Sequence, residues 1–484
     1  MKLNSLLKRF AFFPVLLLFS QFVAQAQENE NPLDTLTRTV NGMRSELDAL
    51  KRIKVTGYIQ GQFQVIDSAG ARSFAGGDFA SGVDKRFMVR RGRIKFTYDA
   101  PLNAKGWSTS QYLLQFDVTE KGLTIKDAWA RLTDPWSGWF SLTAGMQNRP
   151  FGYEIVMSSS VRESPERGRL SQIIFPNERD LGMMLTLQGP KNSNWNWLKI
   201  DAGFFNGTGA PSVGINASDF DKFKDFIGHI GISRTAMEEK IRWGLGASYY
   251  SGGFRHDVSD SYKFGTDAEG SKGFEIVVPK ADVDADINKR LKIERTHVGA
   301  DAQFSISWLA GITTLRGEYI QGTQPGTSGS SASPVAAPTG TATTYTSVTT
   351  IDSLTGTATT TTTASTSTSA SDLYSRKFNG AYFYFVQSIA QTPWQAIVKY
   401  DWYDPNTDVA DDEIGKKVTA PLKATNGTDI KYTTLGLGLA YRWDANIKIT
   451  AYYDIVKNET STNLAGFTAD IPDNVFTLRV QVKF

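Results

Sequence analysis

Apolar and polar residues alternate along much of this chain. In the last ten residues, Phe476, Leu478, Val480, Val482 and Phe484 are apolar, and the residues between them are polar. Successive side chains of a strand point to opposite faces, so such a segment has one apolar and one polar face. Sixteen segments have this alternation or a strand composition: 53–66, 85–99, 108–118, 123–133, 138–148, 180–190, 196–205, 226–236, 240–251, 295–307, 310–321, 376–388, 393–403, 430–443, 445–457 and 474–484.

The connections between these segments alternate in length. Those after the even-numbered segments are short, such as 134–137 and 237–239. Those after the odd-numbered segments are long, except 119–122, and include 67–84, 149–179, 206–225, 252–294, 322–375, 404–429 and 458–473. Up-and-down membrane barrels have short periplasmic turns and long external loops. We therefore expect an all-β fold, a sixteen-stranded antiparallel transmembrane β-barrel over 53–484, with both of its ends on the periplasmic side.

The two faces of the expected strands suit a membrane barrel. In 85–99, one face carries Gly92, Ile94, Phe96 and Tyr98, and the other carries Arg91, Arg93, Lys95 and Thr97. The apolar faces would contact outer-membrane lipid and the polar faces would line a lumen. Many tryptophans fall next to the short turns, where an interfacial girdle of aromatic residues is expected.

The amino terminus has the features of a secretory signal. Lys2, Lys8 and Arg9 precede the apolar run 10–19, and Ala24-Gln-Ala26 follows it. This apolar run is shorter than the roughly 20 residues that a membrane helix needs. We expect residues 1–26 to be a signal peptide that is removed on export.

Residues 27–52 show a different period. Apolar residues recur there at alternating spacings of three and four: Leu33, Leu36, Val40, Met43, Leu47 and Leu50. This is a heptad stripe, but it covers fewer than three heptads and is too short to be stable alone. We expect a short periplasmic helix, either in a coiled coil between subunits or packed against its own domain.

Composition narrows the classes of function. The chain has 52 basic and 49 acidic residues, and loss of the three basic residues in 1–26 would leave 49 of each, so net charge indicates no nucleic-acid partner. There are no cysteines for disulfides or thiolate metal sites. The three histidines, His229, His256 and His297, show no metal or triad spacing. We expect no enzyme activity, no cofactor and no metal.

Residues 322–375 are almost entirely Ser, Thr, Ala, Gly and Pro. Such a segment cannot bury enough apolar surface to fold alone. We expect a low-complexity external loop without regular structure, and the alternative is a site of glycan attachment or recognition.

Several runs resemble the phosphate-selective porin O and P family: Arg90-Arg91-Gly-Arg93, Ala144-Gly-Met-Gln-Asn-Arg-Pro150-Phe-Gly152, Arg179-Asp-Leu-Gly182, and Thr434-Leu-Gly-Leu-Gly through Tyr441. The resemblance implies a homotrimer of sixteen-stranded barrels in the bacterial outer membrane. It also implies that the third external loop folds inward and that basic residues conduct anions. The terminal Phe484 resembles the signal read by the outer-membrane assembly machinery.

Loop 149–179 is therefore the expected constriction. The alternative is that this loop lies over the mouth of the barrel. Gly152, Pro165 and Gly168 allow it to bend, and its five arginines against four glutamates leave a net charge of +1. The expected pore-lining and anion-binding residues are Arg90, Arg91, Arg93, Lys95, Asp127, Arg131, Arg149, Arg162, Arg167, Arg169 and Arg179.

Rows of such donors can replace the hydration of an anion, and the planar guanidinium can hold two phosphate oxygens. Alternatively, these cations pair with Asp117, Asp127, Glu163 or Glu166 and leave a balanced transverse field. Strict alternation points Arg90 at lipid unless a bulge separates it from Arg91. We expect passive diffusion of inorganic anions or small hydrophilic solutes. The alternatives are a general porin and a barrel that tethers the envelope or binds partners at the surface.

Overall fold

The computed structural model describes residues 32–209, 219, 222–255, 260–268, 270–278, 292–334, 339–351 and 358–484. The signal peptide expected over 1–26 lies outside these residues, as does His256. The chain divides into two compact units, Met1–Ile53 and Lys54–Phe484, which are described separately.

The described part of the first unit is helix α2 (Pro32–Leu50). Proline suits the first helical turn because its missing N–H would have no helical acceptor there. Every residue of the helix from Leu33 onward is exposed, including the whole apolar stripe. Among the described residues, no helix combines the length and the hydropathy needed to cross a membrane.

The second unit contains all sixteen expected strands. They are β1 (Ile53–Ile66), β2 (Lys85–Asp99), β3 (Ser110–Thr119), β4 (Gly122–Thr133), β5 (Phe140–Asn148), β6 (Arg179–Gln188), β7 (Leu198–Phe205), β8 (Asp225–Ala236), β9 (Ile241–Arg255), β12 (Lys292–Trp308), β13 (Gly311–Gly326), β16 (Leu373–Ile389), β17 (Trp394–Asp404), β18 (Tyr432–Arg442), β19 (Ile447–Asn458) and β20 (Val475–Lys483). The predicted strands are confirmed, and the long external loops are shorter than predicted because β9, β12, β13 and β16 extend into them.

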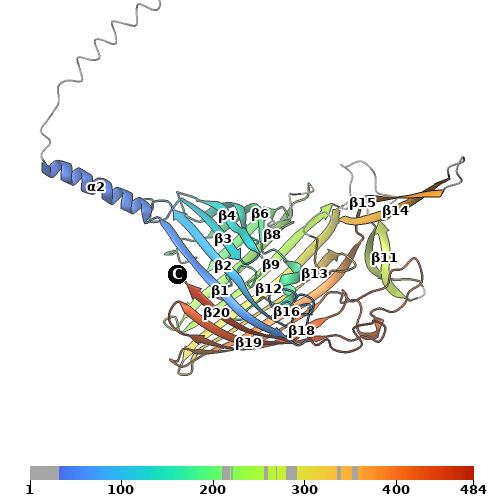
Figure 1. The fold of residues 1–484 in the computed structure, drawn as a ribbon. Helices are drawn as coiled ribbons and strands as arrows, with labels where there is room; N and C mark the ends of the chain where they lie inside the picture. Colours follow the sequence, from blue (N-terminus) through green and yellow to red (C-terminus); the bar gives the residue numbers. More distant parts are fainter. Residues whose placement is uncertain are drawn as a thin grey trace, which may run out of the picture. The chain divides into compact units, whose positions relative to one another are not determined.

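The sheet closes on itself. Each of these strands pairs with the next, and β20 pairs antiparallel with β1 from Tyr58↔Lys483 to Ile66↔Val475. In Figure 1, β20, β1 and β2 lie side by side as one wall of the barrel. Closure leaves none of the sixteen strands with an unpaired edge. The sixteen-stranded antiparallel barrel is therefore confirmed.

The closing strand β20 shows how the barrel meets its surroundings. Leu478 and Val480 are 40% and 43% exposed, whereas Thr477 and Arg479 between them are 0% and 4% exposed. The apolar side chains thus point outward and the polar ones inward. A closed barrel satisfies its backbone hydrogen bonds internally and can present an apolar wall to lipid. This is a protein of the bacterial outer membrane.

Two pairs of strands in the external loops were not predicted. They are β10 (Ser261–Thr266) with β11 (Lys272–Val278), and β14 (Thr339–Ile351) with β15 (Ala358–Ala370). The β14–β15 ribbon occupies the segment expected to lack regular structure, so that expectation is wrong for these ranges. Threonine is β-branched and favours extended backbone, and the composition argument overlooked this preference.

Candidate functional site

The third external loop, 149–178, carries the short helix α3 (Arg169–Ile174) and runs through the inside of the barrel. Its residues bond to inward-facing side chains on opposite walls. The Gly152 N–H donates to Ser248 Oγ of β9 at 2.8 Å, and Lys448 Nζ of β19 donates to the Arg162 carbonyl oxygen at 3.1 Å. A loop lying over the mouth would not reach both walls in this way.

Apolar side chains hold one part of the loop against the barrel wall. Phe151, Leu170, Ile174 and Phe175 are at most 2% exposed and pack in one cluster with inward-facing residues of the wall such as Tyr250. Fully burying each such side chain contributes about 1.5–3 kcal/mol. Ile173 also belongs to this cluster, so all of 173–175 contributes to it.

A buried carboxylate fixes the start of the loop. Glu318 of β13 is 2% exposed and accepts hydrogen bonds from the backbone N–H groups of Tyr153 and Glu154, each at 3.1 Å. The Tyr382 hydroxyl donates to the same oxygen at 2.8 Å. Gly152 has φ +61°, and a Cβ there would collide with the Glu318 carboxylate, so this turn requires glycine.

Three arginines meet the carboxylate of Glu166, in the middle of the loop. Arg90 and Arg91 each hold it with two hydrogen bonds, of 2.9 and 3.1 Å for Arg90 and of 3.1 and 2.7 Å for Arg91. Arg479 Nη2 of β20 donates to it at 2.8 Å. Burial alone would raise the pKa of Glu166, but these three cations hold that pKa well below its usual value.

The consecutive residues Arg90 and Arg91 therefore both reach into the lumen. Regular alternation would send one of them to lipid, so the strand departs from alternation at this point, as a bulge does. Arg91 and Arg93 are 7% and 4% exposed. Arg90 could point inward only if alternation broke between Arg90 and Arg91, and such a break is present.

A second ionic group surrounds Glu178 at the end of the loop. Arg167 Nη2 and Arg179 Nη1 donate to its carboxylate at 3.1 and 2.5 Å, and Arg93 Nη2 lies 3.6 Å from it. Burial would raise the pKa of Glu178, but Arg167 and Arg179 are the main causes that lower it well below its usual value. Two further carboxylates complete the group: Asp117, 3.2 Å from Arg93, and Asp127, 3.2 Å from Arg179.

The other predicted residues divide into paired and unpaired cations. Arg149 lies 3.1 Å from Asp180 in an ion pair. Lys95, Arg131, Arg162 and Arg169 have no carboxylate within 4.0 Å among the residues that the structure describes. Instead, Arg131 donates to Thr143 Oγ1 at 3.0 Å, Arg162 donates to the Pro165 carbonyl at 3.2 Å, and the Arg169 guanidinium lies 3.7 Å from the centre of the Tyr432 ring.

Sequence reasoning missed several charged residues of the lumen. Lys126 precedes Asp127 where the pairing of β3 with β4 shifts by one residue, so a bulge in β4 leaves Lys126 without a partner across the ladder. Lys399 and Asp401 form an ion pair of 3.0 Å on the inner face of β17. The period of two could have identified the β17 pair, because both residues fall on the polar face of a predicted strand.

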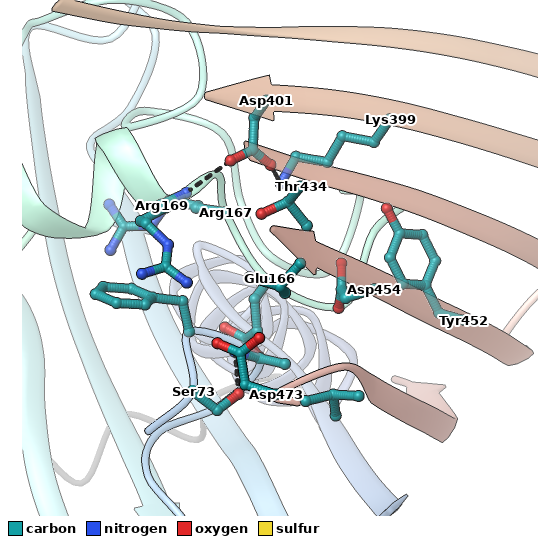
Figure 2. Close-up of a pocket in the computed structure, with 14 residues that line it drawn as sticks. Ser73, Glu166, Arg167, Arg169, Lys399, Asp401, Thr434, Tyr452, Asp454 and Asp473 are labelled. Carbon is teal, nitrogen blue, oxygen red and sulfur yellow. Dashed lines mark hydrogen bonds and ion pairs between the residues drawn. The ribbon is translucent and has the colours of Figure 1, made fainter. Parts of the chain in front are cut away.

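A narrow cavity lies between the loop and the wall formed by β17 to β20. Its volume is about 30 Å³, which gives room for about two water molecules. Figure 2 shows Arg167 and Arg169 of the loop on one side, with Tyr452 and Asp454 of β19 across from them. Other charged side chains of its lining are Glu166, Lys399, Asp401 and Asp473.

Because of Asp473, in the external loop before β20, we expect the ion selectivity to depend on pH. Burial raises the pKa of its carboxyl to about 6, although nearby Arg169 acts in the opposite direction. Between pH 7 and pH 5 the cavity therefore loses a negative charge, and permeation of anions relative to cations should increase. Asp473→Asn should reduce this change in bilayer recordings, whereas Asp411→Asn, at an exposed position of another external loop, should not. An identical pH response in all three proteins would contradict the prediction.

The closed barrel, its apolar outer wall and the loop inside its lumen define the class: a porin-type barrel of the outer membrane. No protein-family model and no curated protein sequence matches this chain. One solved structure that resembles it is an anion-selective porin from Comamonas acidovorans, with 10% identity over 89% of this chain and 99% of that one and a TM-score of 0.48. Another is the outer-membrane channel DcaP of Acinetobacter baumannii, with 12% identity over 89% of this chain and 97% of that one and a TM-score of 0.48. The trimer form of OmpT, an outer-membrane protein of Vibrio cholerae, has 9% identity over 89% of this chain and 99% of that one, with a TM-score of 0.44.

Proposed function

We propose that this protein is a porin that lets small hydrophilic solutes diffuse passively across the outer membrane, with a modest preference for anions. Loop 149–178 acts as the constriction, and the protein works as a homotrimer without enzyme activity. The observation that carries the anion preference is the set around Glu166, where three guanidinium groups share one carboxylate. This set keeps an excess of two positive charges.

Other cations of the inner wall also support a preference for anions. Lys95 and Lys448 are inward-facing by strand register and make no ion pair of 4.0 Å or less with any described residue. A cation without a partner raises the local concentration of anions in a low-dielectric channel. The resemblance of the arginine-rich runs to phosphate-selective porins O and P points in the same direction.

The preference should be modest and should not single out phosphate. Glu166 already occupies the forks of Arg90 and Arg91, so a phosphate would have to compete with an internal carboxylate. Near Glu178, the four cations Arg93, Lys126, Arg167 and Arg179 lie close to three carboxylates, those of Glu178, Asp117 and Asp127. This part of the lumen thus has an excess of only one positive charge, close to the balanced field of a general porin.

Liposome swelling tests the proposed diffusion. Vesicles containing the folded protein should swell in small neutral sugars, and the rate should fall steeply as the sugars become larger. The size dependence follows from the proposed constriction of the lumen by loop 149–178. If correctly folded protein admits no solute of any size, the channel function is wrong, and the envelope-tethering or surface-binding role takes its place.

The carboxyl terminus also closes the barrel. The Phe484 N–H donates to the Gly57 carbonyl at 3.0 Å, and the Gly57 N–H donates back to the Phe484 carbonyl at 2.9 Å. The Phe484 side chain itself is 58% exposed. Phe484 therefore continues the ladder between β20 and β1.

A further inference from the structure

Helix α2 carries a continuous apolar face. Leu36, Val40, Met43, Leu47 and Leu50 lie on this face, and their exposed fractions run from 50% to 65%. Monomeric proteins rarely leave a contiguous apolar stripe in water, and such stripes mark interaction surfaces. A helix of this length is also marginal in water unless its apolar face is packed.

The spacing of these residues identifies the kind of partner. Val40 and Leu47 fall at a positions of the heptad, and Leu36, Met43 and Leu50 fall at d positions. Residues at a and d pack into holes on a neighbouring helix of the same pattern. A second copy of this chain supplies such a helix.

Charges flanking the stripe fix the direction and the register. Glu46 falls at g and Lys51 at the following e position, and these two positions meet between helices in a parallel, in-register coiled coil. Within one chain, the ion partner of Lys51 is Asp48 at 3.7 Å, with both side chains more than half exposed, a contact of little energy. Lys51 can therefore turn to Glu46 of another copy.

The membrane imposes the same direction. Lys51 and Arg52 are the only residues between α2 and the first barrel strand. Barrels in one membrane insert with their long loops on the same side, so every copy begins β1 at the periplasmic face. Neighbouring helices are then tethered at the same end and run parallel.

We propose that the α2 helices of neighbouring copies form a parallel, in-register coiled coil in the periplasm. This contact rests on the homotrimer of the proposed function and adds what joins its copies in the periplasm, apart from the diffusion pathway. Its energy comes from burying the a and d side chains, and the pairs between Glu46 and Lys51 select the register.

The absence of cysteine from the chain allows a direct cross-linking test. Val40→Cys places thiols at an a position, where copies of the same residue meet, and Ser45→Cys places them at the outermost f position. Under mild oxidation in membranes, Val40→Cys should give disulfide-linked dimers on non-reducing gels, and Ser45→Cys should remain mostly monomeric. Equal linking of both variants, or no linking of Val40→Cys, would overturn the proposal.

A charge exchange tests the register separately. Glu46→Lys and Lys51→Glu should each lower the temperature at which the oligomer dissociates, and the double variant should restore it. Native mass measurement gives the number of copies. A double variant no better than the single variants would refute the assigned register, while channel activity of each variant reports on the barrel independently.

Discussion

Replacing residues 150–177 by a short Gly-Ser turn should increase single-channel conductance several-fold and admit larger sugars. Asn148 and Arg179 are directly paired on β5 and β6, so a short turn can join the two strands without disturbing the ladder. The replacement removes the loop from the lumen together with Glu166. Because Arg90, Arg91 and Arg479 then lack a counter-charge, the widened pore should also favour anions more strongly. Bilayer recording measures both changes.

A matched control is removal of residues 339–370, which hold the β14–β15 ribbon. The described strands of this ribbon pair only with each other and form a separate two-stranded sheet. Conductance should remain unchanged after this removal. The constriction assignment would be wrong if removing the inward loop left conductance as it was, or if both deletions changed it equally.

Neutralising Glu166 should raise the ratio of anion to cation permeability about sevenfold. A unit charge at about 7 Å changes the energy of an ion by about 0.6 kcal/mol even in water-like surroundings, with opposite signs for an anion and a cation. The ratio therefore shifts by about 1.2 kcal/mol, and each 1.36 kcal/mol is a factor of ten. Glu166→Gln keeps the size of the side chain but leaves three arginines with no shared carboxylate. The zero-current potential across a bilayer in a KCl gradient reports the ratio.

Glu166→Asp is the control for this prediction, because it keeps the charge and shortens the side chain by one methylene. It should change the potential much less than Glu166→Gln. A Glu166→Gln protein that folds normally but keeps the original potential would show that this group of arginines lies away from the path of the ions.

Stability should respond to pH in a definite direction. The pKa values of Glu166 and Glu178 are lower in the folded protein than in the unfolded chain. Their ionised carboxylates therefore stabilise the fold above the unfolded pKa, and this stabilisation is lost only as pH falls through the lower folded pKa values. Mild acid should therefore leave the loop in place.

Most of the barrel could be predicted from the sequence because membrane strands carry a physical signature. The alternation in 474–484 and the alternating loop lengths both follow from one wall facing lipid and one end facing the periplasm. The inward path of the third loop was expected from the family resemblance and from its length. The structure supplies the contacts that hold it there, such as Glu318 with the backbone of Tyr153.

The remaining features depend on information that a linear pattern does not hold. A bulge changes the face of every later residue without changing composition, so neither the inward direction of Arg90 nor the position of Lys126 could be fixed in advance. Ion pairs that close the lumen join distant positions, such as Arg479 and Glu166, which are 313 residues apart. The sequence could name Arg91 and Glu166 as candidate partners, but only the fold shows that three arginines share one glutamate.

The measurement that tests the central claim most directly is the zero-current potential of the unmodified protein in a planar bilayer under a KCl gradient. The account predicts stable conductance steps and a potential whose sign shows chloride passing more readily than potassium, by a few-fold. A potential that favours potassium, or an absence of steps from correctly folded protein, would contradict it.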